Sequence, residues 1–272
     1  MREIPPICLR GAFTLLELLV VIATIGILAA LLLPALSSAK SRGLQSHCLS
    51  NNRQLILAWT VFADDNEGQL PPNVDGVDGG GVYTNWVAGT MSRFQDATNS
   101  ALLVDQTQSL IAYYVEDPRL FKCPGDRSFF VRSFAINHRM NPVRYLGEPV
   151  FTQGSGTNFA TFRKTGDISR PSDMFVVIDE RSDSINDAYF VVDVTNTGEP
   201  DGTGTSKPYF IVDYPASYHA GGTISFADGH SEVHKWVEPT TNPPLGQAKP
   251  RSFTSPTNRD LQWLQAHATH RR

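Results

Sequence analysis

The chain has 272 residues, of which 41% are hydrophobic and 18% are charged, and its formal net charge is −4 at pH 7. An acidic chain provides no basic field for a nucleic-acid backbone, which argues against nucleic acid as a partner. Residues 18–39 form a run of 22 residues without a charge. At about 1.5 Å per helical residue the run spans roughly 33 Å, close to the hydrocarbon thickness of a bilayer. No comparable run follows, so the sequence excludes a polytopic membrane protein and an ordinary cytosolic enzyme.

The first segment, residues 1–12, precedes the apolar run and carries Arg2, Glu3 and Arg10 in the manner of a leader peptide. The run ends in LLLPALS, a poor match to the small residues that follow the apolar core of a secretory signal. Glu17 places a carboxylate at the start of the apolar stretch. An acid in a membrane segment costs about 2.5–3.5 kcal/mol at the bilayer centre and less near the interface. Glu17 therefore indicates a functional contact.

Residues 11–22, GAFTLLELLVVI, resemble the N-terminal cleavage and methylation motif of type IV prepilins and type II secretion pseudopilins. In that family a prepilin peptidase cuts after a small residue, usually glycine, and methylates the new amino-terminal residue. The family glutamate is the fifth mature residue, which implies a cut between Ala12 and Phe13 and methylation of Phe13. A cut between Gly11 and Ala12 would restore the common glycine but would move Glu17 out of register, so it ranks second.

The resemblance implies that the apolar helix drives assembly. Pro34 becomes the twenty-second mature residue, where pilins commonly have a helix-kinking proline. The Glu17 carboxylate would pair with the free amine of Phe13 on a neighbouring subunit and offset the burial of both charges. The alternative is that Glu17 lies at the headgroup interface and titrates there.

The orientation in the membrane follows from the resemblance and not from charge. Arg2 and Arg10 on one side of the run are balanced by Lys40 and Arg42 on the other, so the positive-inside rule does not decide. The family's topology implies a leader in the cytoplasm and a C-terminal domain in the periplasm.

A helical pattern continues beyond the apolar run until Gly68 and the pair Pro71-Pro72 end it. Its apolar members recur at three-, four- or seven-residue steps and are Leu44, Cys48, Leu55, Trp59 and Phe62. We expect an α+β, pilin-like fold in which this long N-terminal helix packs on a mainly antiparallel β-sheet head. The expected divisions are a leader (1–12), a membrane and assembly helix (13–36), its periplasmic continuation (37–68), a head (69–238) and a Pro-rich tail with a short C-terminal helix (239–272).

The head reads as short strands with few helices. Residues 101–115 predict one helix, and residues 175–178 and 189–192 have the composition of strands. The clearest hairpin joins residues 223–227 to residues 230–237 through Asp228-Gly229, a pair that suits a two-residue type I′ turn. Residues 239–256 are expected to be irregular, and residues 258–268 to form a short helix.

Removal of the leader would take Cys8 with it and leave Cys48 and Cys123. Two cysteines in an oxidising compartment can form a single intramolecular bridge. We predict a Cys48–Cys123 disulfide that ties the head to the helix and contributes about 2–4 kcal/mol. The alternative is two buried thiols.

Residues 218–230, YHAGGTISFADGH, resemble the C-terminal motif of a subgroup of large pilin-like proteins known mainly from genomes. In that motif nine residues lie between a histidine and Asp-Gly, whereas eight residues lie between His219 and Asp228 here. Residues 63–71 and 121–124 also resemble the subgroup. The subgroup has no established biochemical role, so the resemblance implies a fold and a location but no reaction.

Acidic residues gather in the connection after the strand at 175–178, and histidines lie around the predicted hairpin. If the two loops meet, oxygen ligands outnumber nitrogens, which favours a structural calcium ion over zinc. The candidate ligands are Asp179, Glu180, Asp183, His219, Asp228 and His230, with Asp187 in the same connection. The spacing does not fit an EF-hand, and a solvated acidic loop is the alternative. His230 and His234 lie four apart, too far along a strand to share an ion.

The sequence thus favours a structural subunit over an enzyme, with no cofactor other than the candidate calcium. Its expected partners are a prepilin peptidase, other pilin or pseudopilin subunits and the inner membrane, which it would cross once. The assembled product would be a type II secretion pseudopilus or a type IV pilus-like filament. One alternative is a membrane-anchored periplasmic module that binds glycans through exposed Trp86, Trp236 and Trp263. A metal-dependent hydrolase that uses His219, Asp228 and His230 ranks last.

Overall fold

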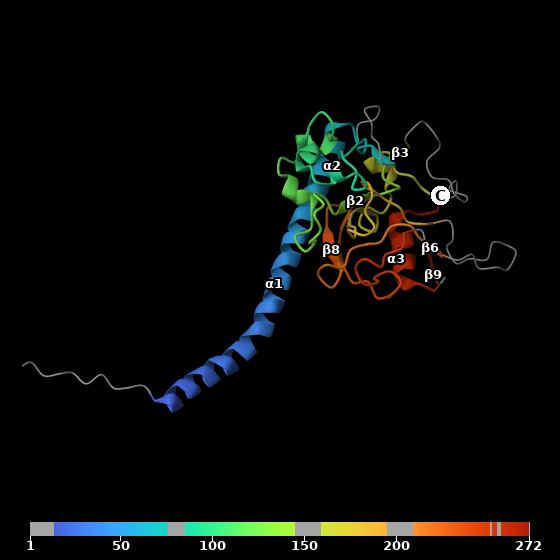
Figure 1. Cartoon of the computed structure of the whole chain (residues 1–272). Helices are drawn as coiled ribbons and strands as arrows, with labels where there is room; N and C mark the ends of the chain where they lie inside the picture. Colours follow the sequence, from blue (N-terminus) through green and yellow to red (C-terminus); the bar gives the residue numbers. More distant parts are fainter. Residues whose placement is uncertain are drawn as a thin grey trace, which may run out of the picture. The chain divides into compact units, whose positions relative to one another are not determined.

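The computed structural model describes residues 14–75, 85–144, 159–194, 209–250, 252–254 and 257–271 (Figure 1). The chain divides into two compact units, residues 1–43 and residues 44–272. The predicted leader and the predicted cut, at Gly11, Ala12 and Phe13, lie outside the described residues.

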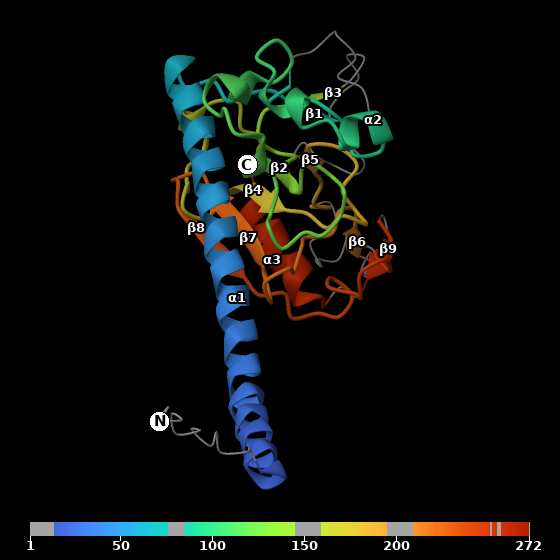
Figure 2. The same ribbon diagram turned by 60° about the vertical axis from the view of Figure 1, so that its left-hand side comes forward.

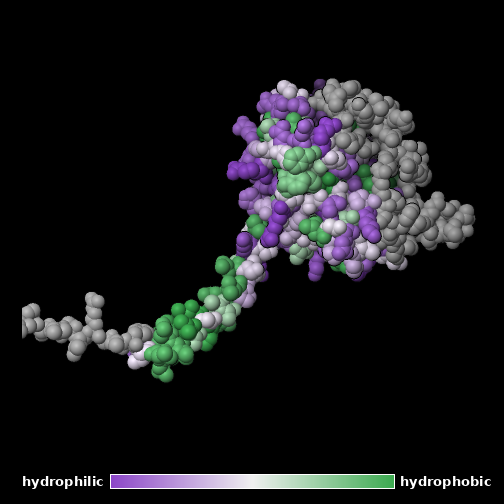
Figure 3. Space-filling model, in the orientation of Figure 1, coloured by the Kyte–Doolittle hydropathy of each residue, from purple (hydrophilic) through white to green (hydrophobic). Residues whose placement is uncertain are grey.

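Helix α1 (Leu15–Asp65) begins in the first unit and ends in the second. Every described side chain of the first unit is exposed, and large apolar side chains cover this part of the helix (Figure 3). A helix that is apolar all round needs either a protein core or a membrane to cover it. Among the described residues, α1 is the one helix that is long and apolar enough to cross a membrane. This agrees with the predicted single span.

Pro34 lies inside α1, as predicted. Because proline has no backbone N–H, the carbonyl four residues earlier lacks its usual intrahelical partner. The helix ends at Asp65, three residues before the predicted stop at Gly68. There the Gly68 N–H donates to the carbonyl of Ala63 at 2.8 Å and closes the last turn.

The second unit contains a five-stranded sheet in the order β5-β2-β4-β7-β8. Its strands are β2 (Phe134–Asn137), β4 (Phe175–Asp179), β5 (Tyr189–Phe190), β7 (Gly222–Phe226) and β8 (Ser231–His234). All neighbours are antiparallel except β2 and β5, which are parallel. Two small sheets pair β1 (Asn73–Asp75) with β3 (Pro142–Arg144) in parallel and β6 (Tyr209–Ile211) with β9 (Ser252–Thr254) in antiparallel. The expected α+β class with a mainly antiparallel sheet is confirmed.

The five-stranded sheet is covered on both faces. One core cluster joins α1 to the sheet and includes Leu55, Ile56, Trp59, Phe134, Ile136 and Val177. A second cluster joins the sheet to α3 (Arg259–Ala268) and includes Ala135, Phe175, Ile178, Ile224, Leu261 and Leu264. Residues 134, 135 and 136 alternate between the clusters, as the two-residue period of a strand requires. The sheet therefore lies between the second half of α1 and α3 (Figure 2).

The C-terminal helix predicted at residues 258–268 is confirmed as α3, and the Asn258 side chain caps it by accepting from the Leu261 N–H at 2.8 Å. Its burial in the second cluster makes it part of the head. The segment expected to be a tail is therefore continuous with the folded unit.

The single helix predicted over residues 101–115 is wrong. Two 3-10 helices occupy the region, η1 (Ser100–Val104) and η2 (Leu110–Tyr113), between α2 (Phe94–Ala97) and η3 (Pro118–Phe121). The Asp105 carboxylate accepts hydrogen bonds from the Thr107 amide and hydroxyl and from the Gln108 side chain. These bonds form a turn that competes with continuation of a helix. A further 3-10 helix, η6, spans Thr165–Asp167.

The β7–β8 hairpin is confirmed, but its turn differs from the predicted two-residue type. Phe226 pairs with His230, and the Gly229 N–H donates to the Phe226 carbonyl at 2.9 Å. The loop thus has three residues, 227–229, and Gly229 has a φ of 92°. A type I turn followed by a left-handed glycine is the usual three-residue hairpin loop.

Two leucines on α1 test which face of the helix packs on the head. Leu55 is fully buried, whereas Leu57 is 62% exposed. We expect Leu55→Ala to lower the free energy of unfolding by about 2–5 kcal/mol, because a cavity forms beneath the helix. Leu57→Ala, the matched control, should change it by less than about 0.5 kcal/mol. Denaturant unfolding of the full chain in a fixed detergent, followed by tryptophan fluorescence, measures both, and equal effects would contradict the packing.

Candidate functional site

The first turn of α1 is closed by a reciprocal pair of hydrogen bonds. The Glu17 Oε2 atom accepts from the Thr14 amide and from the Thr14 hydroxyl, each at 2.8 Å. The Glu17 N–H in turn donates to the Thr14 Oγ1 at 3.2 Å. Thr14 and Glu17 thus form a capping box, with threonine at the N-cap and glutamate three residues later. Sequence reasoning missed this role, although the T-x-x-E spacing was there to be seen.

The apolar surface of the first half of α1 has no partner within the described chain. Its large hydrophobic side chains between residues 15 and 36 are 43–81% exposed, with Val21 and Leu15 at the two extremes. Contiguous apolar surface of this extent marks a membrane or protein interaction site in a stable protein. The same segment carries the two predicted assembly residues, Glu17 at its start and Pro34 near its end.

A cluster of two cysteines and one histidine lies inside the second unit. Cys48 comes from α1, Cys123 from the loop after η3, and His219 from the loop before β7. The two sulfurs and a ring nitrogen of His219 all lie within 4.8 Å of one another. The Cys123 Sγ atom is 3.0 Å from the Nε2 atom of His219. All three residues are at most 6% exposed.

The predicted Cys48–Cys123 disulfide is not present, because both cysteines are free thiols in the structure. The prediction brought the correct two residues together but missed His219 as the third member. The separations along the chain, 75 residues from Cys48 to Cys123 and 96 from Cys123 to His219, give no local signal of such a group.

Contacts of the Cys123 loop with α1 and with His219 bring the three side chains together. The Asn51 side chain donates to the carbonyls of Arg119 and Lys122, which holds the Cys123 loop against α1. The loop passes close to His219 at Gly125, where a Cβ atom would lie 2.6 Å from the imidazole Cε1. Any other residue at position 125 would push the loop away from the ring. Glycine therefore permits the close approach of Cys123 and His219.

Asp179 adds a buried carboxylate to the cluster. Its Oδ1 atom accepts from the Ser133 hydroxyl at 2.8 Å, and its Oδ2 atom is 3.8 Å from the Cys48 sulfur. The same Ser133 oxygen accepts from the Cys123 amide at 2.9 Å. On the other side, the Thr223 hydroxyl lies 3.1 Å from the Cys48 sulfur.

Burial governs the ionisation of this cluster. It is the main reason that the pKa of Asp179 lies well above its usual range and that the pKa of Cys48 is raised. The pKa of Cys123 is raised by its hydrogen bond to Cys48 and by burial. The pKa of His219 is lowered by burial. In the absence of a cation, the environment therefore favours neutral thiols, a neutral carboxylic acid and a neutral imidazole.

The six predicted calcium ligands do not form one site. Asp179 and His219 lie at the cysteine cluster, but Glu180 accepts a hydrogen bond from the Ser184 hydroxyl instead. Asp183 pairs with Arg181 at 2.8 Å and accepts from the amides of Gly246 and Ala248. These local bonds separate the acidic residues of the connection.

The remaining two predicted ligands, Asp228 and His230, pair with each other at the tip of the hairpin, at 2.6 Å between Oδ1 and Nδ1. His230 also stacks on Phe226. The hydrolase constellation of His219, Asp228 and His230 is therefore divided between the buried cluster and the hairpin tip. Within the described residues, the one grouping with metal-ligand geometry is that of Cys48, Cys123 and His219.

The three tryptophans proposed for glycan binding do not form an exposed face. Trp86 is fully buried, and its Nε1 donates to the Ala188 carbonyl. Trp236 is 5% exposed and donates to the Ala216 carbonyl. Trp263 is half-buried and stacks between His234 and His267. The expectation of exposed aromatic side chains is wrong for Trp86 and Trp236.

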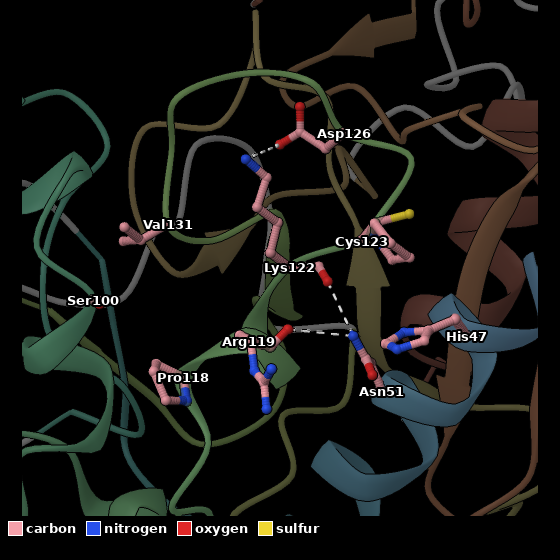
Figure 4. Close-up of a pocket in the computed structure, with 10 residues that line it drawn as sticks. His47, Asn51, Ser100, Pro118, Arg119, Lys122, Cys123, Asp126 and Val131 are labelled. Atoms are coloured by element: carbon pink, nitrogen blue, oxygen red, sulfur yellow. Dashed lines mark hydrogen bonds and ion pairs between the residues drawn. The ribbon is translucent and has the colours of Figure 1, made fainter. Parts of the chain in front are cut away.

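A cavity of about 410 Å³ opens beside the cluster. His47 and Asn51 of α1 form one wall, and Arg119, Lys122 and Asp126 line the loop side (Figure 4). Lys122 and Asp126 form an ion pair at 3.6 Å. Cys123 lines the same cavity, so one member of the cluster is reached from it.

Comparisons with known proteins found no similar protein. No family model matches the chain, and neither the curated proteins nor the solved structures contain a match.

Proposed function

We propose that the chain is a pilin-like structural subunit, processed by a prepilin peptidase and assembled through the first half of α1 into a pseudopilus or pilus-like filament. The observation that carries the proposal is the uncovered apolar surface of α1. A bilayer covers that surface before assembly, and the helices of neighbouring subunits cover it afterwards. The rest of the chain would then lie in the periplasm, and the subunit would be stored in the inner membrane until it is assembled.

Glu17 supports the proposal because it is the one acid in the apolar stretch. A carboxylate in apolar surroundings needs an opposite charge, and the free amine produced by cleavage before Phe13 would provide it on a neighbouring subunit. In a single chain the carboxylate instead accepts hydrogen bonds from Thr14. Assembly would therefore exchange or share these bonds, and Glu17 would set the register between subunits.

The division of α1 into two parts also supports a filament subunit. Residues 15–43 have no buried side chain, whereas the helix beyond residue 44 is anchored in the head by Leu55, Ile56 and Trp59. One continuous helix thus connects the apolar segment to the folded unit. This is the arrangement that a subunit needs if it polymerises through one part and displays the other.

Processing by a prepilin peptidase predicts a specific mature mass. Co-expression of the full chain with the peptidase should remove residues 1–12 and add one methyl group to the amine of Phe13. Intact-mass spectrometry and N-terminal peptide sequencing measure both changes. Ala12→Gly is the control and should be cut at the same bond, since it provides the glycine that the peptidase commonly accepts. A mature chain that begins at Ala12 would contradict the assigned cut.

Two substitutions separate the assembly role of Glu17 from its capping role. Glutamine retains an acceptor for the Thr14 amide but removes the charge, because a capping box accepts either residue. We expect Glu17→Gln and Glu17→Ala both to reduce incorporation into filaments by more than about tenfold. Each would leave the Phe13 amine of a neighbouring subunit without its partner, and an unpaired charge costs about 2.5–3.5 kcal/mol in the membrane core. Quantitative immunoblotting of sheared filaments against the membrane pool measures incorporation.

The matched control for Glu17 is Asp64→Asn, which removes an exposed acid from the other end of the same helix. It should assemble as the unchanged chain does. Normal incorporation of Glu17→Gln together with loss in Glu17→Ala would assign Glu17 to helix capping alone and would contradict the charge-pairing account.

A further inference from the structure

We propose that Cys48, Cys123 and His219 bind a Zn²⁺ ion that fastens α1 to the head, with the buried Asp179 carboxyl group next to the site. The inference rests on the buried cluster and is independent of the assembly role of the apolar helix. It assigns a ligand to a group of side chains that the proposed function does not use.

The donor atoms match those of structural zinc sites. Cysteine sulfur and histidine nitrogen are the usual ligands of tetrahedral zinc, and a carboxylate oxygen serves as well. On binding, Cys48 and Cys123 each release a proton to solvent and coordinate as thiolates, while His219 coordinates through the Nε2 lone pair of its neutral ring. No oxidation or reduction takes place.

The distances bring the ligand atoms within reach of one ion, and the His219 and Cys123 side chains would move apart to coordinate it. With zinc about 2.3 Å from sulfur and about 2.1 Å from nitrogen or oxygen, adjacent ligand atoms of a tetrahedron lie roughly 3.5–3.8 Å apart. The Asp179 Oδ2 atom is 3.8 Å from the Cys48 sulfur, and the His219 Nε2 atom is 3.0 Å from the Cys123 sulfur. All three sulfur and nitrogen atoms already lie within 4.8 Å of one another.

Second contacts orient the ligands as they do in metal sites. Ser133 bridges Asp179 and the Cys123 amide, with distances of 2.8 and 2.9 Å. Thr223 lies 3.1 Å from the Cys48 sulfur, within reach of a hydroxyl donor. Such partners would fix the orientation of the ligands around a bound metal.

A cation at the cysteine cluster would also act on the neighbouring Asp179 carboxyl group. The carboxylate is 1% exposed, and within the described parts of the chain it forms no ion pair. A buried carboxylate without a cation is unfavourable or must be protonated. A divalent ion between Asp179 and the two sulfurs would remove that cost. A disulfide would leave Asp179 with its hydrogen bond from Ser133 and would give His219 no role.

The ion also has a route of entry. Cys123 lines the cavity next to His47 and Asn51, so the cavity extends to the edge of the buried cluster (Figure 4). An entry path is one of the features that a genuine metal site requires.

The experiment measures metal in the full chain, purified in detergent from expressing cells without chelator. Elemental analysis should give about one zinc per chain in the unchanged protein. Cys48→Ser, Cys123→Ser and His219→Gln should each lose most of that zinc. His230→Gln is the matched control, because it removes an exposed histidine of the predicted calcium set and should retain the zinc.

A spectroscopic measurement on the unchanged protein tests the site even if the variants fail to fold. The unchanged protein, stripped of metal and titrated with Co²⁺, should develop the intense visible bands of a tetrahedral centre and a sulfur-to-cobalt charge-transfer band in the near ultraviolet. Thermal melting should shift upward as the metal is restored.

Three results would overturn the proposal. One is a Cys48–Cys123 disulfide in protein whose thiols were alkylated at lysis, since oxidised sulfurs cannot bind zinc as thiolates. Another is a cobalt spectrum without the sulfur band. The third is full zinc content in folded His219→Gln.

Discussion

The structure depends on one constraint, which is that the first half of α1 presents an apolar surface that its own chain does not cover. Its large side chains are 43–81% exposed from residue 15 to residue 36. Exposed apolar area is unfavourable in water by about 25 cal/mol per Å². A bilayer or a protein partner can remove that cost. In the proposed function, the membrane and the filament are two ways to cover the same apolar surface, and Glu17 is the charged group proposed to set the register in the filament.

The apolar side chains in the second half of the same helix are covered by the chain's own sheet. Leu55, Ile56 and Trp59 pack against one face of the sheet, while α3 covers the other. The contact with β7 is polar, because Cys48 meets Thr223 and Asn52 meets Ser225. Polar contacts of this kind hold a helix in one register, since sliding would leave buried groups unpaired. The zinc proposal extends the same principle, because a metal bound to Cys48 would fix α1 against two head loops.

Sequence patterns predicted those features that depend on local periodicity and composition. The apolar run, the amphipathic pattern from Cys48 to Phe62, the strand at 175–178, the hairpin and the C-terminal helix all follow from residue spacing, whereas the strand predicted at 189–192 is limited to Tyr189–Phe190. The helix expected over residues 101–115 failed because Asp105 forms a competing side-chain turn. The two-residue turn failed because Gly229 occupies the third position of a longer loop.

The candidate sites were harder to predict because they depend on contacts between distant segments. The sequence analysis singled out Cys48, Cys123, Asp179 and His219, which the structure brings together, but it assigned them to two different sites. Which acids and histidines share a neighbourhood is decided by the order of strands in the sheet, and spacing along the chain does not reveal that order. The buried tryptophans show the same limit, since composition does not tell an exposed indole from a core indole.

The most direct test of the account is photocrosslinking from the apolar surface of α1. A photoreactive amino acid replaces Leu19, which is 55% exposed, in cells that express the full chain with a prepilin peptidase and the filament machinery. The account predicts crosslinks from position 19 to other copies of the chain or to other pilin-like subunits, identified by mass spectrometry. A matched probe at Leu57, an exposed position in the second half of α1, should give no crosslinks to the apolar helices of neighbouring subunits. Crosslinks from position 19 to lipid alone, in cells that display filaments containing the chain, would contradict it.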